Sequence, residues 1–377
     1  MKILYVYKAL AIWGGIERVL VDKMNYLSEN KDNSIFIITT EQGSHNNPYL
    51  MNDRITHIDL GMKFQEQYKY HRFKRIVLTY KNNRLFKNEI KRTIINIQPD
   101  IIICVAELYV DTLVKTKGNV PLIIESHSIY DKTLISKKYN LFKKLRRHVY
   151  MHYFKKADAI VALTKNDAKK WSIKFKNVIA IPNVVHLNNT GSYTTCVNHS
   201  IIFVGRMAQQ KGLNSLIEIW KQIIIKHPDW ELNIFGDGEY KDTFISEIEK
   251  YDNRMSILYH APETNIINEY CKNSIFILTS EYEPFGLVIP EAMSCGLPVV
   301  SFDVPYGPSE IIHNGIDGFL IKPNNINDFV NKLSLLIENR ELRCKMGKEA
   351  VKSSLKYSYN NIMPKWEQLF HSITHKM

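Results

Sequence analysis

Two glutamates stand close together in a part of the sequence that is otherwise apolar. The stretch "EPFGLVIPE" begins at Glu283 and ends at Glu291, and the apolar run Leu297–Val300 follows shortly afterwards. An ionised carboxylate is costly to remove from water, so such side chains in apolar surroundings usually have a partner. We therefore treat both glutamates as candidate functional residues.

Two cations lie on one loop nearer the middle of the chain. In "FVGRMAQQKGLNSLIEIW" (203–220), Arg206 comes just after an expected strand and Lys211 just before an expected helix. This arrangement suits a diphosphate, with Arg as a fork of donors and Lys as a point charge. The alternative is that both side chains are simply solvated. The later turn "IFGDGEY", which contains Gly236, by itself indicates only that the backbone turns there.

The N-terminal half carries two further candidate sites. Gly14 and Gly15, in "WGGIERVLVDKMNYLSE", come after the first expected strand and open a helix, where free N–H groups suit a phosphate. An ordinary tight turn would use the same residues. His127, in "LIIESHSIYDK", follows the strand that ends near Glu125. Histidine is the usual proton donor or acceptor near neutral pH, although a lone histidine is more often structural.

Alternating strands and helices must position these residues. Continuous apolar runs bounded by polar residues predict buried parallel strands: "KILYVY", "SIFIIT", "DIIICV", "PLIIES" and "AIVALT", then "SIIFVG", "WELNIFG", "SIFILTS", "LPVVSF" and "GFLIK". The pattern predicts an α/β protein with two Rossmann-like domains, whose sheets present their carboxyl ends to a central cleft. The expected parts are an N-terminal domain (1–185), a polar linker (186–199), a C-terminal domain (200–357) and a helix that crosses back (358–377).

The composition is that of a folded protein without a membrane-spanning segment. Hydrophobic residues make up 45% and charged residues 23% of the 377 residues, which is ordinary for a globular enzyme. No apolar run reaches the roughly 18 residues of a spanning helix, and the run Ile3–Tyr7 is too short for a signal peptide. The five cysteines are widely spaced and form no CxxC pair. A reducing cytoplasm is therefore expected, without disulfides or a zinc site.

The net charge of +12 comes from the N-terminal half. Residues 1–185 contain 32 Lys and Arg against 16 Asp and Glu, whereas residues 186–377 contain 18 against 22. Residues 62–92 hold ten basic and two acidic side chains among aromatic ones, and residues 132–156 hold nine basic and none acidic. Such segments are attracted to anionic lipid head groups, so we expect peripheral association with the inner face of the cell membrane. The alternative is a solvated helix face; no recognition motif indicates nucleic acid as a partner.

Together, these motifs resemble those of a known family. The GG turn, the GR and KG pairs, "FGDGE" and above all "EYEPFGLVIPEAMSCGLPVVSFDVPYGPSEIIHNGIDGFLI" are similar to the retaining glycosyltransferases of family 4, which have the GT-B fold. The resemblance runs from Met1 to about Phe370. It implies transfer of a sugar from a nucleotide diphosphate donor, usually a UDP-sugar, without a cofactor or metal ion. Richness in Lys, Asn and Ile, together with the basic aromatic stretches, favours a bacterial enzyme that extends a lipid-linked or cell-surface glycan.

The resemblance also implies a role for each candidate residue. Glu291 would hold the ribose hydroxyls, and Glu283 would face the donor sugar and stabilise positive charge as the leaving group departs. Arg206 and Lys211 would neutralise the departing diphosphate, and His127 would lie near the transferred sugar. Backbone contacts with the donor would come from the glycine turns and a helix start, namely Gly14, Gly15, Gly236, Phe285, Gly286 and Leu287.

One turn departs from the family pattern, and several alternatives stay open. The turn expected to bind the base reads Tyr259, His260 and Ala261, where the family often has a glycine. A nucleotide-sugar 2-epimerase would share the fold, whereas a phosphorylase would need a pyridoxal-binding lysine motif that the sequence lacks. An NAD-dependent oxidoreductase would need G-x-G-x-x-G after the first strand. A non-enzymatic protein that binds anionic polymers would leave Glu283 and Glu291 without a role.

Overall fold

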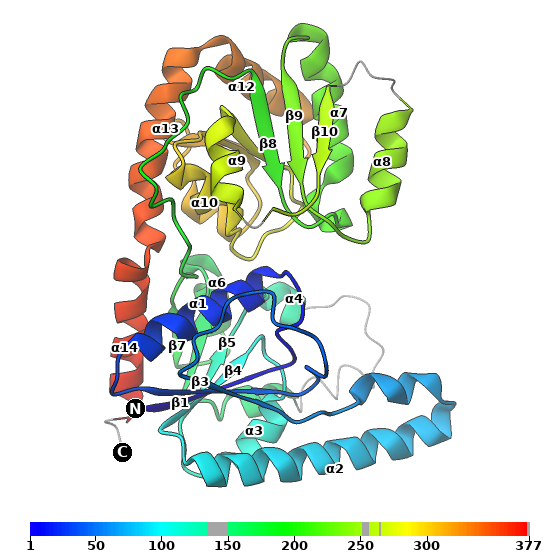
Figure 1. Cartoon of the computed structure of the whole chain (residues 1–377), viewed down its shortest axis with the longest axis vertical. Coiled ribbons are helices and arrows are strands. Elements are labelled where there is room, and N and C mark those ends of the chain that lie inside the picture. Colours follow the sequence, from blue (N-terminus) through cyan, green and yellow to red (C-terminus); the bar gives the residue numbers. More distant parts are fainter. Residues whose placement is uncertain (135–149, 251–255, 264, 375–377) are drawn as a thin grey trace. The chain divides into compact units, whose positions relative to one another are not determined.

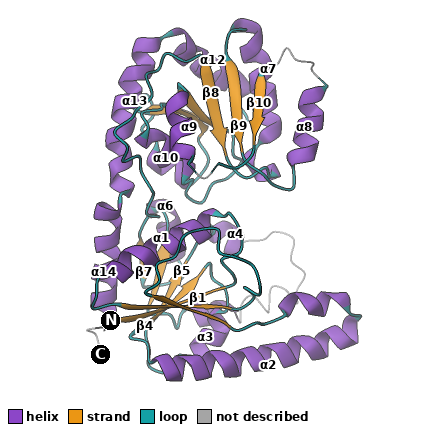
Figure 2. Cartoon of the chain, in the orientation of Figure 1, coloured by secondary structure: helices purple, strands orange, loops and turns teal. Residues whose placement is uncertain are grey.

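The computed structural model describes residues 1–134, 150–250, 256–263 and 265–374. Contacts within the chain divide it into two compact units: residues 1–184 with the residues from Met363 onward, and residues 185–362. Each unit is a parallel β-sheet covered by helices (Figure 1, Figure 2). The α/β fold with two doubly wound sheets is thereby confirmed.

Short apolar strands form the sheet of the first unit. They are β1 (Lys2–Tyr7), β2 (Ser34–Thr39), β3 (Ile55–Asp59), β4 (Ile101–Val105), β5 (Leu122–Glu125), β6 (Ala159–Ala162) and β7 (Val178–Ala180). Their order across the sheet is β3-β2-β1-β4-β5-β6-β7, with every neighbouring pair parallel. All residues of β4, β5 and β6 are buried, as expected for strands covered on both faces.

The helices of this unit pack on both faces of the sheet. They are α1 (Gly15–Glu29), α2 (Arg72–Ile97), α3 (Val110–Thr116), α4 (Tyr130–Leu134), α6 (Lys165–Ser172) and most of α14 (Tyr359–Thr374), with the 3₁₀-helix η1 (Phe64–Lys69). The C-terminal half of α2 packs Phe86, Ile90 and Ile94 into the core. Its N-terminal part runs out beyond the strands (Figure 1). Most of the second basic stretch, residues 135–149, lies outside the described residues.

The second unit repeats this architecture. Its strands are β8 (Ser200–Val204), β9 (Glu231–Phe235), β10 (Ile257–His260), β11 (Ile275–Leu278), β12 (Val299–Phe302) and β13 (Gly318–Ile321), in the order β10-β9-β8-β11-β12-β13 and all parallel. Its helices are α7 (Leu213–Lys226), α8 (Lys241–Glu249), α9 (Ile266–Lys272), α10 (Val288–Ser294), α11 (Gly307–Ile311), α12 (Ile326–Glu338) and α13 (Arg340–Ser354), with the 3₁₀-helices η2 (Gln209–Lys211) and η4 (Leu355–Tyr357).

Both sheets therefore reverse their strand order at one point. In the first unit this point lies between β1 and β4, and in the second unit between β8 and β11. Ligands of open α/β sheets bind at the carboxyl ends of strands beside such a point. The loops that follow these four strands are the first places to look for a functional site. Among the described residues, no helix is both long and apolar enough to cross a membrane.

Candidate active site

Arg206 lies two residues beyond β8, on the surface of the second unit. Its guanidinium contacts Oε2 of Glu239, with Nη2 at 3.0 Å and Nε at 3.1 Å. The two side chains are 69% and 61% exposed, so solvent screens this ion pair strongly. Arg206 is therefore accessible to a ligand, and it takes its protein partner from the turn that follows β9.

Lys211 and Glu283 form an ion pair at the carboxyl ends of β8 and β11. Nζ of Lys211 lies 2.6 Å from Oε2 of Glu283, and the two side chains are only 11% and 9% exposed. Ser280 donates a second hydrogen bond to the same oxygen, at 3.2 Å. Thr279, the residue after β11, donates to the carbonyl of Lys211 at 2.9 Å. Two sequence candidates thus stand together at the switch point of the second sheet.

Glu291 lies on α10, eight residues after Glu283 and also buried. Tyr270 of α9 donates a long hydrogen bond, 3.4 Å, to Oε2 of Glu291. The short turn before α10 contains Phe285, Gly286 and Leu287, and the backbone of Gly286 has a φ of +87°. A Cβ there would lie 2.9 Å from Cγ of Glu283. The turn therefore needs glycine both for its left-handed conformation and for its closeness to Glu283.

Gly236 and the proposed base-binding turn have partners within the protein. A Cβ on Gly236 would lie 1.9 Å from the carbonyl oxygen of Gly205, so packing between two loops explains this glycine without a ligand. Tyr259 donates to the carbonyl of Gly236 at 2.7 Å. The ring of His260 stacks on Phe235 with the centroids 4.4 Å apart. Tyr259 and His260 are partly exposed, whereas Phe235 is buried.

In the first unit, Gly14 precedes α1 and Gly15 is its first residue. The carboxylate of Glu17, in the first turn of the helix, is nearly buried and accepts a hydrogen bond from Tyr7 at 2.7 Å. Burial raises the pKa of Glu17, against the effect of the Tyr7 hydrogen bond. Two expected ligand-binding glycines therefore lie beside a buried carboxyl group that the sequence analysis did not single out.

His127 lies two residues after β5, beside a second buried carboxylate. Its Nε2 is 3.1 Å from Oε1 of Glu125, and its side chain is only 3% exposed. The same oxygen contacts Nζ of Lys23, which comes from α1. Burial would raise the pKa of Glu125, but Lys23 and His127 outweigh that effect and hold it at about 2. Burial in turn lowers the pKa of Lys23, and its contact with Glu125 opposes that effect.

A strained loop after β4 brings a third carboxyl group to this end of the sheet. Ala106, Glu107 and Tyr109 have φ values of +56°, +55° and +62°, which are unfavourable for residues other than glycine. The buried Glu107 accepts a hydrogen bond from Ser126, the neighbour of His127. Burial raises the pKa of Glu107 to about 7, although Ser126 and the charge of His127 act in the opposite direction.

Comparison with models of known protein families shows which family the chain belongs to. The model "Glycosyltransferase Family 4" matches residues 13–189, and "Glycosyl transferases group 1" matches residues 198–353. An uncharacterized glycosyltransferase of Methanocaldococcus jannaschii is 30% identical over 255 residues, which cover 66% of this chain and 68% of that protein. The chain belongs to glycosyltransferase family 4. The resemblance found in the sequence is thereby confirmed.

Two further relatives match this glycosyltransferase over shorter shares of their own length. An uncharacterized glycosyltransferase of Haemophilus influenzae is 34% identical over 213 residues, covering 56% of this chain and 60% of that protein. The poly(ribitol-phosphate) alpha-N-acetylglucosaminyltransferase of Staphylococcus aureus is 28% identical over 258 residues, covering 66% of this chain and 50% of that protein. The chain thus spans between half and two thirds of the length of these two relatives.

Solved structures identify the fold of the glycosyltransferase as GT-B. The crystal structure of TarM of S. aureus covers 98% of both chains with a TM-score of 0.80 at 19% identity. HepE of Anabaena, in complex with UDP and glucose, covers 99% of this chain and 100% of its own with a TM-score of 0.73 at 18% identity. At such identities the likeness concerns the fold alone.

Sequence reasoning missed charged residues that lie in or beside these sites: Glu17, Lys23, Glu107, Glu125 and Glu239. The sequence pattern does indicate that Lys23 is buried, because it lies on the face of α1 that also carries Val19, Met24 and Leu27. A lysine inside an apolar helical stripe indicates a buried charge with a partner. The sequence also marks Glu125, because it is a carboxylate at the end of an apolar strand, two residues before the candidate histidine.

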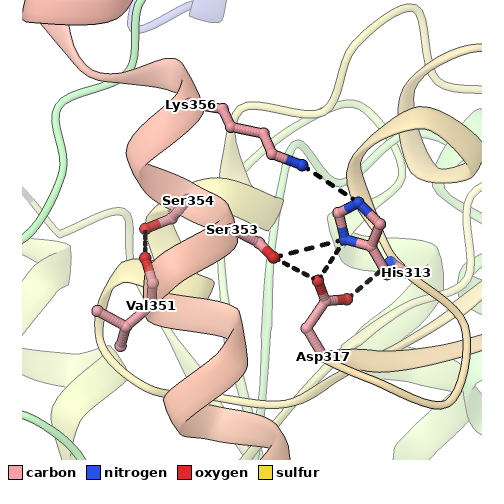
Figure 3. A network of polar contacts seen from close by, with 6 residues as sticks. All are labelled: His313, Asp317, Val351, Ser353, Ser354 and Lys356. Carbon is pink, nitrogen blue, oxygen red and sulfur yellow. Dashed lines mark hydrogen bonds and ion pairs between the residues drawn. The ribbon is translucent and has the colours of Figure 1, made fainter.

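A polar network elsewhere in the second unit resembles a catalytic triad in composition but not in geometry. Oδ2 of the fully buried Asp317 lies 2.6 Å from Nδ1 of His313 and accepts a hydrogen bond from Ser353 at 2.7 Å (Figure 3). Nε2 of His313 lies 3.2 Å from Nζ of Lys356. Because the hydroxyl donates to the carboxylate, the imidazole is not placed to activate it. The network instead connects the turn at His313–Asp317 to the end of α13.

Proposed function

We propose that the protein transfers a sugar from a UDP-sugar to a hydroxyl group of a bacterial cell-surface or lipid-linked glycan, with retention at the anomeric carbon. The ion pair between Lys211 and Glu283 carries this proposal, because it puts a cation and a carboxylate together at the switch point of a doubly wound sheet. Arg206 on the same loop supplies a second, accessible cation. This combination suits a diphosphate attached to a sugar.

The proposed chemistry uses charges that are already in place. Arg206 and Lys211 neutralise the departing diphosphate, a preorganised contribution that is typically worth about 3 kcal/mol per group. Glu283 binds hydroxyls of the donor sugar and stabilises the positive charge that develops at the anomeric carbon. Glu291 accepts hydrogen bonds from the ribose. We assign His127 of the first unit to the transferred sugar, as the family resemblance implies.

The relatives support the donor and acceptor classes. HepE was crystallised with UDP and glucose, and the Staphylococcus relative is named for transfer of N-acetylglucosamine to poly(ribitol phosphate). Both names concern sugar nucleotides or surface polymers. We therefore propose UDP as the leaving group and a surface glycan or polyol phosphate polymer as the acceptor class.

Screening a panel of nucleotide sugars for hydrolysis and transfer tests this proposal directly. UDP-glucose and UDP-N-acetylglucosamine should be consumed with formation of an α-linked product, and turnover should persist in EDTA. Ultrafiltration should retain UDP but neither NAD nor single-stranded RNA. Conversion of the donor into its 2-epimer without transfer would favour the epimerase instead, and retention of RNA would favour the non-enzymatic alternative.

We propose further that the protein works at an anionic membrane surface, with the projecting part of α2 as the attachment site. Four large apolar side chains there are at least 66% exposed: Phe73, Ile76, Val77 and Tyr80. Their spacing of three and four residues makes one stripe along the helix. Exposed basic residues surround it: Lys74, Arg75, Lys81, Arg84, Lys87, Lys91 and Arg92.

This pairing of charge and apolar surface supports a lipid partner. Basic residues on an amphipathic helix attract anionic head groups, while exposed apolar side chains enter the boundary with the acyl chains. Tyr70 and Tyr68 lie against Lys74 and Arg75, at 4.0 Å and 4.2 Å from the cationic groups to the ring centroids. Most of the other basic stretch, including Lys143, Lys144, Arg146 and Arg147, lies outside the described residues and adds no structural support.

A further inference from the structure

A buried lysine and a buried glutamate meet directly beside His127. Lys23 comes from the middle of α1, and Glu125 is the last residue of β5, so the chain separates them by 102 residues. Their side chains are each 1% exposed. The proposed transfer reaction uses neither of them, because neither is accessible to a substrate.

One carboxylate oxygen takes both contacts. Oε1 of Glu125 contacts Nζ of Lys23 and lies 3.1 Å from Nε2 of His127. Nε2 of His127 has no hydrogen-bond partner among the described residues, so this close contact with Oε1 is not a hydrogen bond. The other oxygen, Oε2, is buried without a hydrogen-bond partner in the part of the chain that the structure describes. The negative charge of Glu125 is thus directed at the lysine and the histidine together.

Aromatic rings enclose the lysine. Nζ of Lys23 lies 4.2 Å from the ring centroid of Trp366, on α14, and 5.9 Å from that of Tyr5, on β1. Trp366 and Tyr5 are themselves buried. The C-terminal helix therefore helps to seal the ion pair from water, and attraction between the ammonium group and the rings compensates part of its lost hydration.

Stability alone is a poor reason for such an arrangement. A buried ion pair is often replaced by apolar residues of similar size without loss of stability, because desolvation offsets the attraction between the charges. This position, next to the candidate histidine and at the switch edge of the sheet, offers another reason. A carboxylate fixed between α1 and β5 can orient the neighbouring imidazole, and the cation beside it favours the charged form of that carboxylate.

We infer that Lys23 and Glu125 are positioning residues, which hold the imidazole of His127 in the orientation that its role in sugar transfer requires. The role of His127 in this inference rests on the proposed function, whereas the orientation of its ring does not. Lys23 acts through Glu125, and Glu125 acts through His127.

A double-variant cycle in the full chain tests the inference. Lys23→Met with Glu125→Leu removes both charges at once, so neither is left unpaired. We expect this double variant to keep the urea midpoint and the affinity for UDP of the wild type, and to lose at least tenfold in kcat with UDP-glucose or UDP-N-acetylglucosamine. When the double variant is combined with His127→Ala, kcat should differ less than twofold from that of His127→Ala alone, since both changes remove the same effect. A kcat equal to wild type, or losses that multiply, would overturn the inference.

A second measurement does not depend on turnover. In protein with ¹⁵N-labelled histidine, the ring signals of His127 are assigned by their loss in His127→Ala. They should shift in the double variant and stay unchanged in a control that neutralises the exposed pair on α3, Lys115→Met with Asp111→Asn. Unchanged signals in the double variant would refute positioning even if no nucleotide sugar is turned over. If the double variant Lys23→Met with Glu125→Leu does not fold, the same measurements are made on Lys23→Met with Glu125→Met, which fills the same space.

Discussion

Nζ of Lys211 lies 2.6 Å from Oε2 of Glu283, and this contact joins two residues for which the family resemblance implies separate roles. The cation proposed for the diphosphate is also the partner of the carboxylate proposed for the donor sugar. Arg206, by contrast, pairs with Glu239 in an exposed position. Two cations on one loop should therefore respond differently to substitution.

Lys211→Ala should lower both turnover and stability, whereas Arg206→Ala should lower turnover alone. Each loss of a diphosphate contact should cost about a hundredfold in kcat. Lys211→Ala also leaves the buried Glu283 without its cation, at a cost of about 3 kcal/mol in the free energy of unfolding. The exposed pair of Arg206 should contribute less than about 1 kcal/mol. Urea unfolding and donor hydrolysis measure both effects, and near-normal turnover in either variant would remove that residue from the proposed diphosphate site.

Glu291→Ala and Glu283→Ala should separate nucleotide binding from catalysis. The ribose contact of Glu291 exists in the ground state and the transition state alike, so its loss should weaken calorimetric affinity for UDP. The charge stabilisation by Glu283 grows along the reaction, so its loss should mainly lower kcat. Glu281→Ala, an exposed neighbour, serves as the control. Unchanged affinity for UDP in Glu291→Ala would refute the ribose assignment.

The sequence predicted the interior strands better than the edge strands. Ten continuous apolar runs correspond to strands of the two sheets, but β3, β7 and β10 were not among the predicted strands. All three are sheet edges, and several of their residues are at least partly exposed. An edge strand has one neighbour and less burial, so β3 tolerates polar residues such as His57 and Asp59 and loses its apolar signal.

The candidate site was predictable by residue type but not by pairing. Glu283 and Lys211 were identified separately, since no local pattern shows that two side chains 72 residues apart will meet. The apolar stripe around Lys23 indicates a buried charge but does not identify its partner. Its burial depends on Glu125 and on Trp366 from the last helix, which only the folded sheet order brings to α1.

The exposed stripe of α2 gives the membrane proposal a test beyond net charge. Changing Phe73, Ile76, Val77 and Tyr80 together to Ser should weaken binding to vesicles containing phosphatidylglycerol at least tenfold, because the basic residues alone act only over a Debye length of about 8 Å. A control with Ile173, Ile225 and Leu335 changed to Ser removes exposed apolar side chains elsewhere. Vesicle sedimentation measures the binding.

Activity on two substrates extends this test. Transfer to a lipid-linked acceptor should fall severalfold in the α2 variant, while hydrolysis of the soluble donor stays intact. Wild-type protein should bind neutral vesicles poorly, and salt should weaken its binding to anionic ones. Equal vesicle binding by wild type and variant would mean that the stripe does not insert into lipid, and capture of another protein chain by the stripe would point to a protein partner instead.

Glu107 should make the first unit less stable as the pH rises. Burial raises its pKa from the usual 4.5 to about 7, with the charge of Asp167 adding to the shift and Ser126 and His127 opposing it. A raised pKa means that the folded protein favours the protonated carboxyl, so this contribution is complete below pH 4.5 and is lost as the pH rises through 7.

Glu107→Gln keeps the shape of the protonated side chain without titrating. Between pH 5 and 9, wild type should therefore lose about 3 kcal/mol of unfolding free energy relative to Glu107→Gln. Urea unfolding at both pH values measures this difference, with the exposed Glu29→Gln as the control, and parallel pH dependence of wild type and Glu107→Gln would show that Glu107 is ionised throughout.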